Sequence, residues 1–178
     1  ITEIMKHTQN TVIALVVAAG SGQRTQTDIP KQYIKVKHKA IIDYTLHALY
    51  ACEKIDKILC VIAPDMNAVY QQSVTPHHKL LPVVFGGKTR QESVHLGLTA
   101  LQEHNPNIVL IHDAARPNID DALINALLEA LQHYDGVCTA LPVTDSLRTQ
   151  DGTAISRDNL FMVQTPQAFD FQKILRAH

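Results

Sequence analysis

The sequence predicts a three-layer α/β fold built around a mostly parallel sheet. Short apolar runs rich in β-branched residues alternate with segments whose apolar residues recur at helical spacing, as in consecutive strand–helix units. Two of these runs end in glycines, where a strand of an open sheet would turn toward a helix. A chain of 178 residues can bury one core, so we expect one domain at residues 11–178 after an N-terminal extension at residues 1–10.

The composition indicates an ordinary globular protein of the cytoplasm. Hydrophobic residues make up 46% and the formal charge is −1, so nucleic-acid binding is not expected as the main task. No apolar run approaches the roughly 20 residues of a membrane span, so no membrane partner is expected. Cys52, Cys60 and Cys138 are widely spaced in apolar segments, which predicts reduced core thiols. The ten histidines lack metal-ligand spacing, so no histidine metal site is expected.

The first predicted strand begins at Thr11 and runs into a glycine-rich loop. Gly20 and Gly22 allow a ligand to approach the main chain, so their N–H groups can face phosphate oxygens. Arg24 and Lys31 add two cations beside this loop. A tight turn with two solvated basic residues explains the Gly-x-Gly pair about equally well. The loop alone therefore leaves a phosphate site and a plain turn open.

Two familiar phosphate motifs are absent from this loop. A dinucleotide fingerprint needs a third glycine where Thr25 stands. No Gly-x-x-x-x-Gly-Lys-Ser/Thr sequence occurs either. A dehydrogenase and a P-loop kinase are therefore disfavoured.

The next predicted units are a helix, a strand and a second helix. Ile42, Leu46 and Leu49 share one helical face, which should pack on the sheet. Residues 57–63 form a short apolar run that suits a buried strand, and a weaker helix is predicted at residues 66–74.

A second glycine turn follows a strand predicted at residues 81–85. After Gly86 and Gly87, Thr89 and Glu92 fit a capping box in which each side chain bonds to the main chain near the other. The turn is either an anion or nucleotide contact or a plain loop and cap. The helix that follows carries Val94, Leu98 and Leu101 on its apolar face.

The strand predicted at residues 108–111 leads to Asp113 and Arg116. An aspartate at the end of a buried strand lies where open α/β sheets bind ligands, and it can hold Mg²⁺ between phosphates. Arg116 either contacts an anionic substrate or pairs with Asp113. An amphipathic helix that Asp120 and Asp121 open comes next, and we expect it to be structural.

The last part of the chain predicts a strand, a hairpin and a returning strand. The strand covers residues 136–143, and the polar residues 144–158 suit a protruding hairpin. The chain returns through the apolar residues 160–163 and closes with the start of a helix.

Seven motifs occur in one order from about Thr11 to the end: AAGSGQR, PKQ, GGKTRQESV, HDAARP, PVTDS, SRDNLF and TPQAF. With these motifs the sequence resembles the 2-C-methyl-D-erythritol 4-phosphate cytidylyltransferases of the nonmevalonate isoprenoid pathway. The resemblance implies a Rossmann-like nucleotidyltransferase sheet with a protruding β-hairpin arm. It also implies transfer of a cytidylyl group from CTP to methylerythritol phosphate, with release of pyrophosphate.

The resemblance assigns roles to individual residues. Arg24 and Lys31 would be catalytic, and Asp113 would bind Mg²⁺. The acceptor, methylerythritol phosphate, would be bound by Arg116, Ser146, Arg157 and Thr165. The nucleotide would be held by Ala18, Ala19, Gly20, Gly22, Gly86, Gly87 and Ser93.

The resemblance also implies partners beyond this chain. In the family the hairpin arm reaches into a second subunit, so a homodimer is expected. The family pattern continues past His178 with an acidic metal ligand and a lysine, and some members are fused to a cyclodiphosphate synthase. Two alternatives stay open: a ribitol-5-phosphate cytidylyltransferase, and a non-catalytic nucleotide-binding module.

Overall fold

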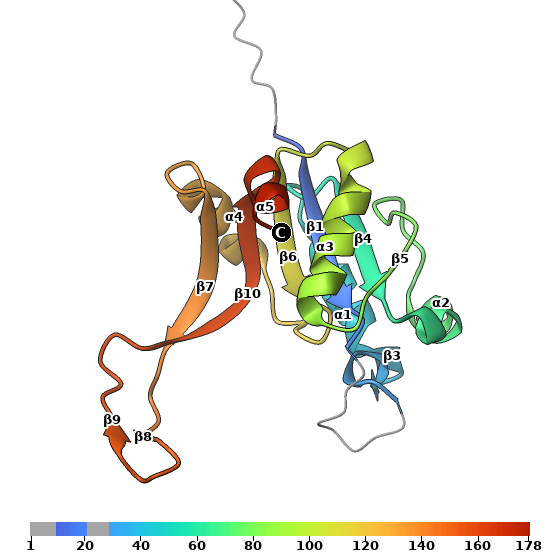
Figure 1. Ribbon diagram of the computed structural model, residues 1–178. Helices are drawn as coiled ribbons and strands as arrows, with labels where there is room; N and C mark the ends of the chain where they lie inside the picture. Colours follow the sequence, from blue (N-terminus) through green and yellow to red (C-terminus); the bar gives the residue numbers. More distant parts are fainter. Residues whose placement is uncertain (1–9, 21–28) are drawn as a thin grey trace, which may run out of the picture.

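The computed structural model describes residues 10–20 and 29–178, and it is built around one six-stranded sheet (Figure 1). The strand order is β5-β4-β1-β6-β10-β7. Neighbours among β5, β4, β1 and β6 are parallel, whereas β10 runs antiparallel to both β6 and β7. The mostly parallel α/β sheet is therefore confirmed. The strand bounds are β1 (Val12–Ala18), β4 (Lys57–Ile62), β5 (Val84–Phe85), β6 (Ile108–Asp113), β7 (Gly136–Pro142) and β10 (Phe161–Asp170).

The central strand β1 is apolar throughout because helices cover both of its faces. Val12, Ala14 and Val16 pack into one core cluster, whereas Ile13 and Leu15 pack into the other. Successive side chains of a strand point to opposite faces, so a strand buried on both sides needs a continuous apolar run.

Helices form the two outer layers (Figure 1). Residues of α1, α2 and α4 belong to one core cluster, and residues of α3 and α5 belong to the other. The face predicted for the first helix is confirmed, since Ile42, Leu46 and Leu49 are fully buried. The helix bounds are α1 (Ile41–Ala51), α2 (Asn67–Ser73), α3 (Arg90–Ala100), α4 (Asp121–Ala130) and α5 (Phe171–Ala177).

The strand expected at residues 81–85 is shorter than predicted. Leu80 makes one isolated bridge with Ile58, and regular pairing resumes only at Val84. Pro82 lies between them and has no N–H to donate to the ladder, which explains the interruption. The neighbouring helix expected at residues 66–74 is a 3₁₀ turn, η3 (Pro64–Met66), followed by α2.

A hairpin arm connects β7 to β10, as predicted. Its strands β8 (Leu147–Arg148) and β9 (Ala154–Ile155) pair antiparallel around a turn in which Gly152 has φ +90. The arm leaves the sheet at the carboxyl end of β7 and extends away from the domain (Figure 1). Because β7 and β6 both run antiparallel to β10, the arm leaves from the edge at which the parallel strands end.

The expectation for the three cysteines is wrong for one of them. Cys52 and Cys60 are buried, but Cys138 is exposed. Cys138 lies on β7, which is the last strand of the sheet and is exposed or half-exposed along its whole length. Among the helices in the described part of the chain, none has the length and apolar character needed to cross a membrane.

Candidate active site

The candidate residues gather at the edge where the parallel strands end. Ala18 is the last residue of β1, Gly86 directly follows β5, and Asp113 is the last residue of β6. In register, Asp113 pairs with Val17, and the N–H of Ala114 donates to the Val17 carbonyl oxygen (3.0 Å). Open α/β sheets bind ligands at this edge.

The two glycine turns are in direct contact. A Cβ atom on Gly86 would lie 2.6 Å from Ala19 Cβ and 2.7 Å from Ser93 Oγ, so only glycine fits. The N–H of Gly87 donates to Ser93 Oγ (3.2 Å), and this buried hydroxyl donates to the Thr89 carbonyl oxygen (2.9 Å). The predicted nucleotide-binding residues Ala19, Gly86, Gly87 and Ser93 therefore form one contact group, which leaves main chain rather than bulky side chains at the surface.

The capping box at the start of α3 differs in one bond from the expected form. Thr89 Oγ1 accepts from the Glu92 N–H (3.0 Å), as predicted. Glu92 Oε2 accepts from the N–H of Lys88 (2.8 Å), one residue before the expected Thr89. The Glu92 side chain occupies the space that a Cβ atom of Gly87 would need, which explains its reach toward Lys88.

Lys31 opens the 3₁₀ helix η2 (Lys31–Tyr33), and its neighbour Gln32 ties this helix to the glycine loop. Gln32 is only 6% exposed, and its Nε2 donates to the carbonyl oxygens of Ala18 (2.7 Å) and Gly20 (3.1 Å). Lys31 itself is exposed. Gln32 was not predicted as a site residue, although its place beside Lys31 in the Pro-Lys-Gln motif was a usable signal.

The predictions for Gly22 and Arg24 lie outside the described residues.

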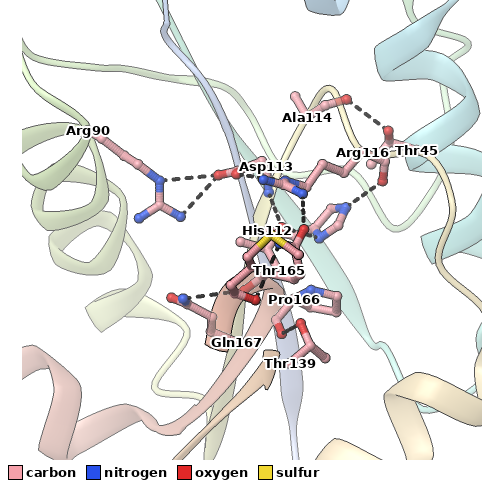
Figure 2. Close-up of polar contacts among 12 residues, drawn as sticks. Thr45, Arg90, His112, Asp113, Ala114, Arg116, Thr139, Thr165, Pro166 and Gln167 are labelled. Atoms are coloured by element: carbon pink, nitrogen blue, oxygen red, sulfur yellow. Dashed lines mark hydrogen bonds and ion pairs between the residues drawn. The ribbon is translucent and has the colours of Figure 1, made fainter. Parts of the chain in front are cut away.

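Asp113 lies between two arginines (Figure 2). Arg90 donates to Asp113 Oδ1 from Nε (3.2 Å) and Nη2 (3.0 Å), and Arg116 Nε donates to Oδ2 (3.2 Å). Of the two roles left open for Arg116, the structure shows the pairing with Asp113. Arg116 also donates to Gln164 Oε1. Neither Arg90 nor Gln164 was predicted, because each reaches Asp113 or its partner only through the tertiary fold.

His112 contacts two residues that lie around Asp113, namely Arg116 and Thr165 (Figure 2). Its ring is fully buried, with Nε2 2.8 Å from the Arg116 carbonyl oxygen and Nδ1 3.1 Å from Thr165 Oγ1. The N–H of Asp113 donates to the same Thr165 hydroxyl (3.2 Å). Burial lowers the pKa of His112, against an opposing effect of its bond to Arg116, so the neutral ring is favoured.

Ser146 and Arg157 are not brought to this edge within the chain. Both lie in the arm, where they are exposed, and Arg157 Nη1 donates to the Thr144 carbonyl oxygen. The structure thus separates the predicted acceptor-binding residues into two sets. Arg116 and Thr165 lie at the sheet edge, whereas Ser146 and Arg157 lie on the arm.

Asp113 fits a magnesium ion that takes most of its ligands from the substrate. In the described ranges, no group of three or more His, Cys, Asp and Glu side chains could hold a metal. Mg²⁺ is commonly held by one or two carboxylates together with substrate phosphates. The half-exposed Asp113 carboxylate at the strand end suits that mode, and Arg90 and Arg116, which pair with it in this structure, place positive charge at the same edge.

The chain is similar to known proteins over nearly its whole length. The bifunctional enzyme IspD/IspF of Wolbachia pipientis wMel is 41% identical over 175 residues, covering 94% of this chain and 44% of that protein. The bifunctional enzyme IspD/IspF of Granulibacter bethesdensis is 44% identical over 171 residues, with the same coverage of both chains. This chain thus spans less than half the length of these relatives.

A solved structure has the same fold. The 2-C-methyl-D-erythritol 4-phosphate cytidylyltransferase (IspD) of Francisella tularensis superimposes with a TM-score of 0.78 at 30% identity, covering 94% of this chain and 76% of that one. The family model described as IspD, 2-C-methyl-D-erythritol 4-phosphate cytidylyltransferase, matches residues 12–178. The chain therefore belongs to the 2-C-methyl-D-erythritol 4-phosphate cytidylyltransferase family.

Proposed function

We propose that this domain transfers the cytidylyl group of CTP to 2-C-methyl-D-erythritol 4-phosphate, giving 4-diphosphocytidyl-2-C-methyl-D-erythritol and pyrophosphate. The observation that carries the proposal is the meeting of two groups at one sheet edge. The contact group of Ala19, Gly86 and Ser93 supplies main chain for a nucleotide, and Asp113 lies one strand away with its arginines. Family membership supports the same reaction.

The nucleotide would lie across the two glycine turns. Ala18, Ala19 and Gly20 at the end of β1, with Gly22, would face the triphosphate, and Gly86, Gly87 and Ser93 would face the cytidine. Main-chain N–H groups suit phosphate oxygens, because they donate without bringing bulk.

Lys31 and Arg24 would stabilise the transition state. The acceptor phosphate attacks the α-phosphorus of CTP, and negative charge builds on the α-phosphoryl oxygens. Cations already fixed beside those oxygens lower the barrier more than cations that must be gathered from solution. The two Gln32 bonds to Ala18 and Gly20 would hold Lys31 at a constant distance from the loop.

Asp113 would hold Mg²⁺. Arg90 and Arg116 would exchange some of their hydrogen bonds to Asp113 for hydrogen bonds to the phosphates. When bound, the metal would neutralise phosphate charge between CTP and the acceptor. The arginines on opposite sides of the carboxylate would then orient the two anionic reactants.

The acceptor site would be completed by a second copy of the chain. Arg116 and Thr165 would come from one protomer, and Ser146 and Arg157 from the arm of its partner. Large apolar side chains are exposed at the base of the arm, including Leu141 (56%), Phe161 (59%) and Val163 (57%). By register, Phe161 and Val163 share one face of these two strands and Leu141 lies on the other. Large apolar side chains exposed in this way are typical of an interface, which supports a homodimer.

A cytoplasmic location completes the proposal. The three cysteines are free thiols, as is usual in a reducing compartment.

The test is pyrophosphate release by the full-length protein with CTP and Mg²⁺, with methylerythritol phosphate and ribitol phosphate offered separately. Release with methylerythritol phosphate alone is the expected result. Release with ribitol phosphate alone would keep the chemistry and overturn the acceptor. Binding of CTP without release under either acceptor would instead indicate a nucleotide-binding module.

A further inference from the structure

His112 is a buried polar side chain to which the proposed reaction gives no role. It lies on β6 directly before Asp113 and is fully buried, yet both ring nitrogens have partners (Figure 2). One partner is the carbonyl oxygen of Arg116 and the other is the hydroxyl of Thr165. The imidazole therefore connects the two acceptor-binding residues predicted at the sheet edge.

The partners determine which ring nitrogen carries hydrogen. A carbonyl oxygen can only accept, so the 2.8 Å contact with Arg116 requires a hydrogen on His112 Nε2. The ring is fully buried and its two nitrogens bond to a carbonyl oxygen and a hydroxyl, not to a carboxylate, so the neutral form is expected and the other nitrogen is then a bare acceptor. His112 Nδ1 therefore takes a hydrogen bond from the Thr165 hydroxyl at 3.1 Å.

This arrangement uses the only hydrogen of the Thr165 hydroxyl. A hydroxyl has one hydrogen to donate and two lone pairs. The hydrogen points at His112 Nδ1, and one lone pair accepts from the Asp113 N–H at 3.2 Å. One lone pair remains for a ligand. A phosphate oxygen has no hydrogen to give to it, whereas a polyol hydroxyl does.

We propose that His112 is a positioning residue of the acceptor site, which holds the Thr165 hydroxyl so that it accepts a hydrogen bond from a hydroxyl group of the acceptor. This rests on the proposed function and refines it, because Thr165 then binds the polyol part of the acceptor and not its phosphate. Arg116, whose carbonyl oxygen accepts from the same ring and whose guanidinium pairs with Asp113, would use that guanidinium for the anion.

The first experiment determines which ring nitrogen of His112 carries hydrogen, and it does not require catalytic turnover. The ¹⁵N chemical shifts of His112 are measured in full-length protein labelled at histidine, with His112→Gln used to assign the signals. We expect hydrogen on Nε2 and none on Nδ1, with a change confined to Nδ1 in Thr165→Val. Hydrogen on Nδ1 would overturn the inference, even if the protein turned over no acceptor at all.

The second experiment separates the two ring nitrogens by substitution. Asn at position 112 can replace Nδ1 as the acceptor for Thr165, whereas Gln can replace Nε2 as the donor to Arg116. We expect His112→Gln to raise the KM for methylerythritol phosphate roughly five- to tenfold, the effect of one lost hydrogen bond, with the KM for CTP unchanged. We expect His112→Asn to restore most of the acceptor affinity.

Thr45→Val provides the matched control. Thr45 Oγ1 is buried and donates to the carbonyl oxygen of Ala114 (2.8 Å), in the same turn that follows Asp113 (Figure 2). Its loss should lower Tm as much as the His112 changes do, with no change in either KM. An equal rise in acceptor KM in Thr45→Val would mean that His112 only stabilises the turn, and would overturn its positioning role.

The third experiment asks which part of the acceptor Thr165 contacts. Methylerythritol without its phosphate, and inorganic phosphate, are each tested as inhibitors that compete with the acceptor. Thr165→Val should raise the inhibition constant of methylerythritol and leave that of phosphate unchanged. A rise for phosphate, alone or together with methylerythritol, would overturn the inference while leaving the proposed reaction intact.

Discussion

The nucleotide half and the acceptor half of the candidate site are built differently. At the nucleotide half, small residues from two turns touch one another, so that the ligand would meet mainly backbone. At the acceptor half, charged and hydroxyl side chains converge on Asp113, while Ser146 and Arg157 lie on the arm and not at the sheet edge. In the proposed function the first half would be formed within one chain, whereas the second would need the arm of a second copy. Nucleotide binding should therefore tolerate loss of the dimer better than turnover does.

The largest expected effect is on kcat, and it follows from removing the positive charge of Lys31. Lys31→Ala should lower kcat by roughly two to three orders of magnitude, because a preorganised charge is lost at the transition state. CTP binding, measured by calorimetry, should change little. Lys35→Ala removes another exposed lysine, from the neighbouring β2 (Lys35–Val36), and should leave both unchanged. An equal loss of CTP affinity in Lys31→Ala would make Lys31 a ground-state binder.

The next prediction tests whether the acceptor half is shared between two copies. Arg157→Ala alone should raise the acceptor KM and leave the CTP affinity unchanged. Mixing Arg157→Ala with Lys31→Ala chains should restore roughly a quarter of wild-type activity, because half the dimers are then mixed and each has one intact site. If the arm serves its own chain, no mixed dimer has an intact site, and at an acceptor concentration far below the raised KM the mixture is no more active than the two variants assayed separately.

A smaller effect is expected for glycine substitutions in the nucleotide half. Gly86→Ala forces a Cβ atom against Ala19 and Ser93, so it should lower the free energy of unfolding by about 1–3 kcal/mol and weaken CTP binding. In the part of the chain that the structure describes, a Cβ atom on Gly20 would meet no atom within 4 Å other than those of its chain neighbours. Gly20→Ala should weaken CTP binding with little change in Tm, so a comparable fall in Tm would contradict the difference between the two glycines.

The last prediction concerns Gln32, which supports the loop and to which the proposed function gives no contact with substrate. Gln32→Leu removes two bonds to carbonyl oxygens and should cost about 1–3 kcal/mol in urea denaturation, with a fall of about tenfold in kcat. Gln172→Leu removes an exposed amide contact with Asn105 and serves as the control. Unchanged kcat in Gln32→Leu would show that Lys31 keeps its place without this tie.

The architecture could be predicted because it depends on local patterns. The apolar run of β1 and the buried face of Ile42, Leu46 and Leu49 required only strand and helix periodicity. The errors arose where the exposure of a side chain or the length of a strand depends on residues that are close in space but distant in sequence. Cys138 is exposed because β7 is an edge strand, and the short β5 follows from Pro82 and its pairing partner.

The site was predicted in part, because only some of its residues lie in local sequence motifs. Ala19, Gly86 and Asp113 lie in recognisable sequence motifs, and in the structure they lie at the carboxyl edge of the parallel strands. Arg90 and His112 act through contacts across 23 residues and 53 residues of sequence, respectively, which no local pattern reveals.

The close contact of Gly86 with Ala19 and Ser93 bears on how such a domain diverges. A side chain added at any of these positions would have to be matched by a loss of volume at another, so the three should change together or not at all. The surface side chains around Asp113 are under no such packing constraint. Descendants of one ancestor could therefore exchange one phosphorylated alcohol for another by drift at the acceptor half, while inheriting the nucleotide half unchanged.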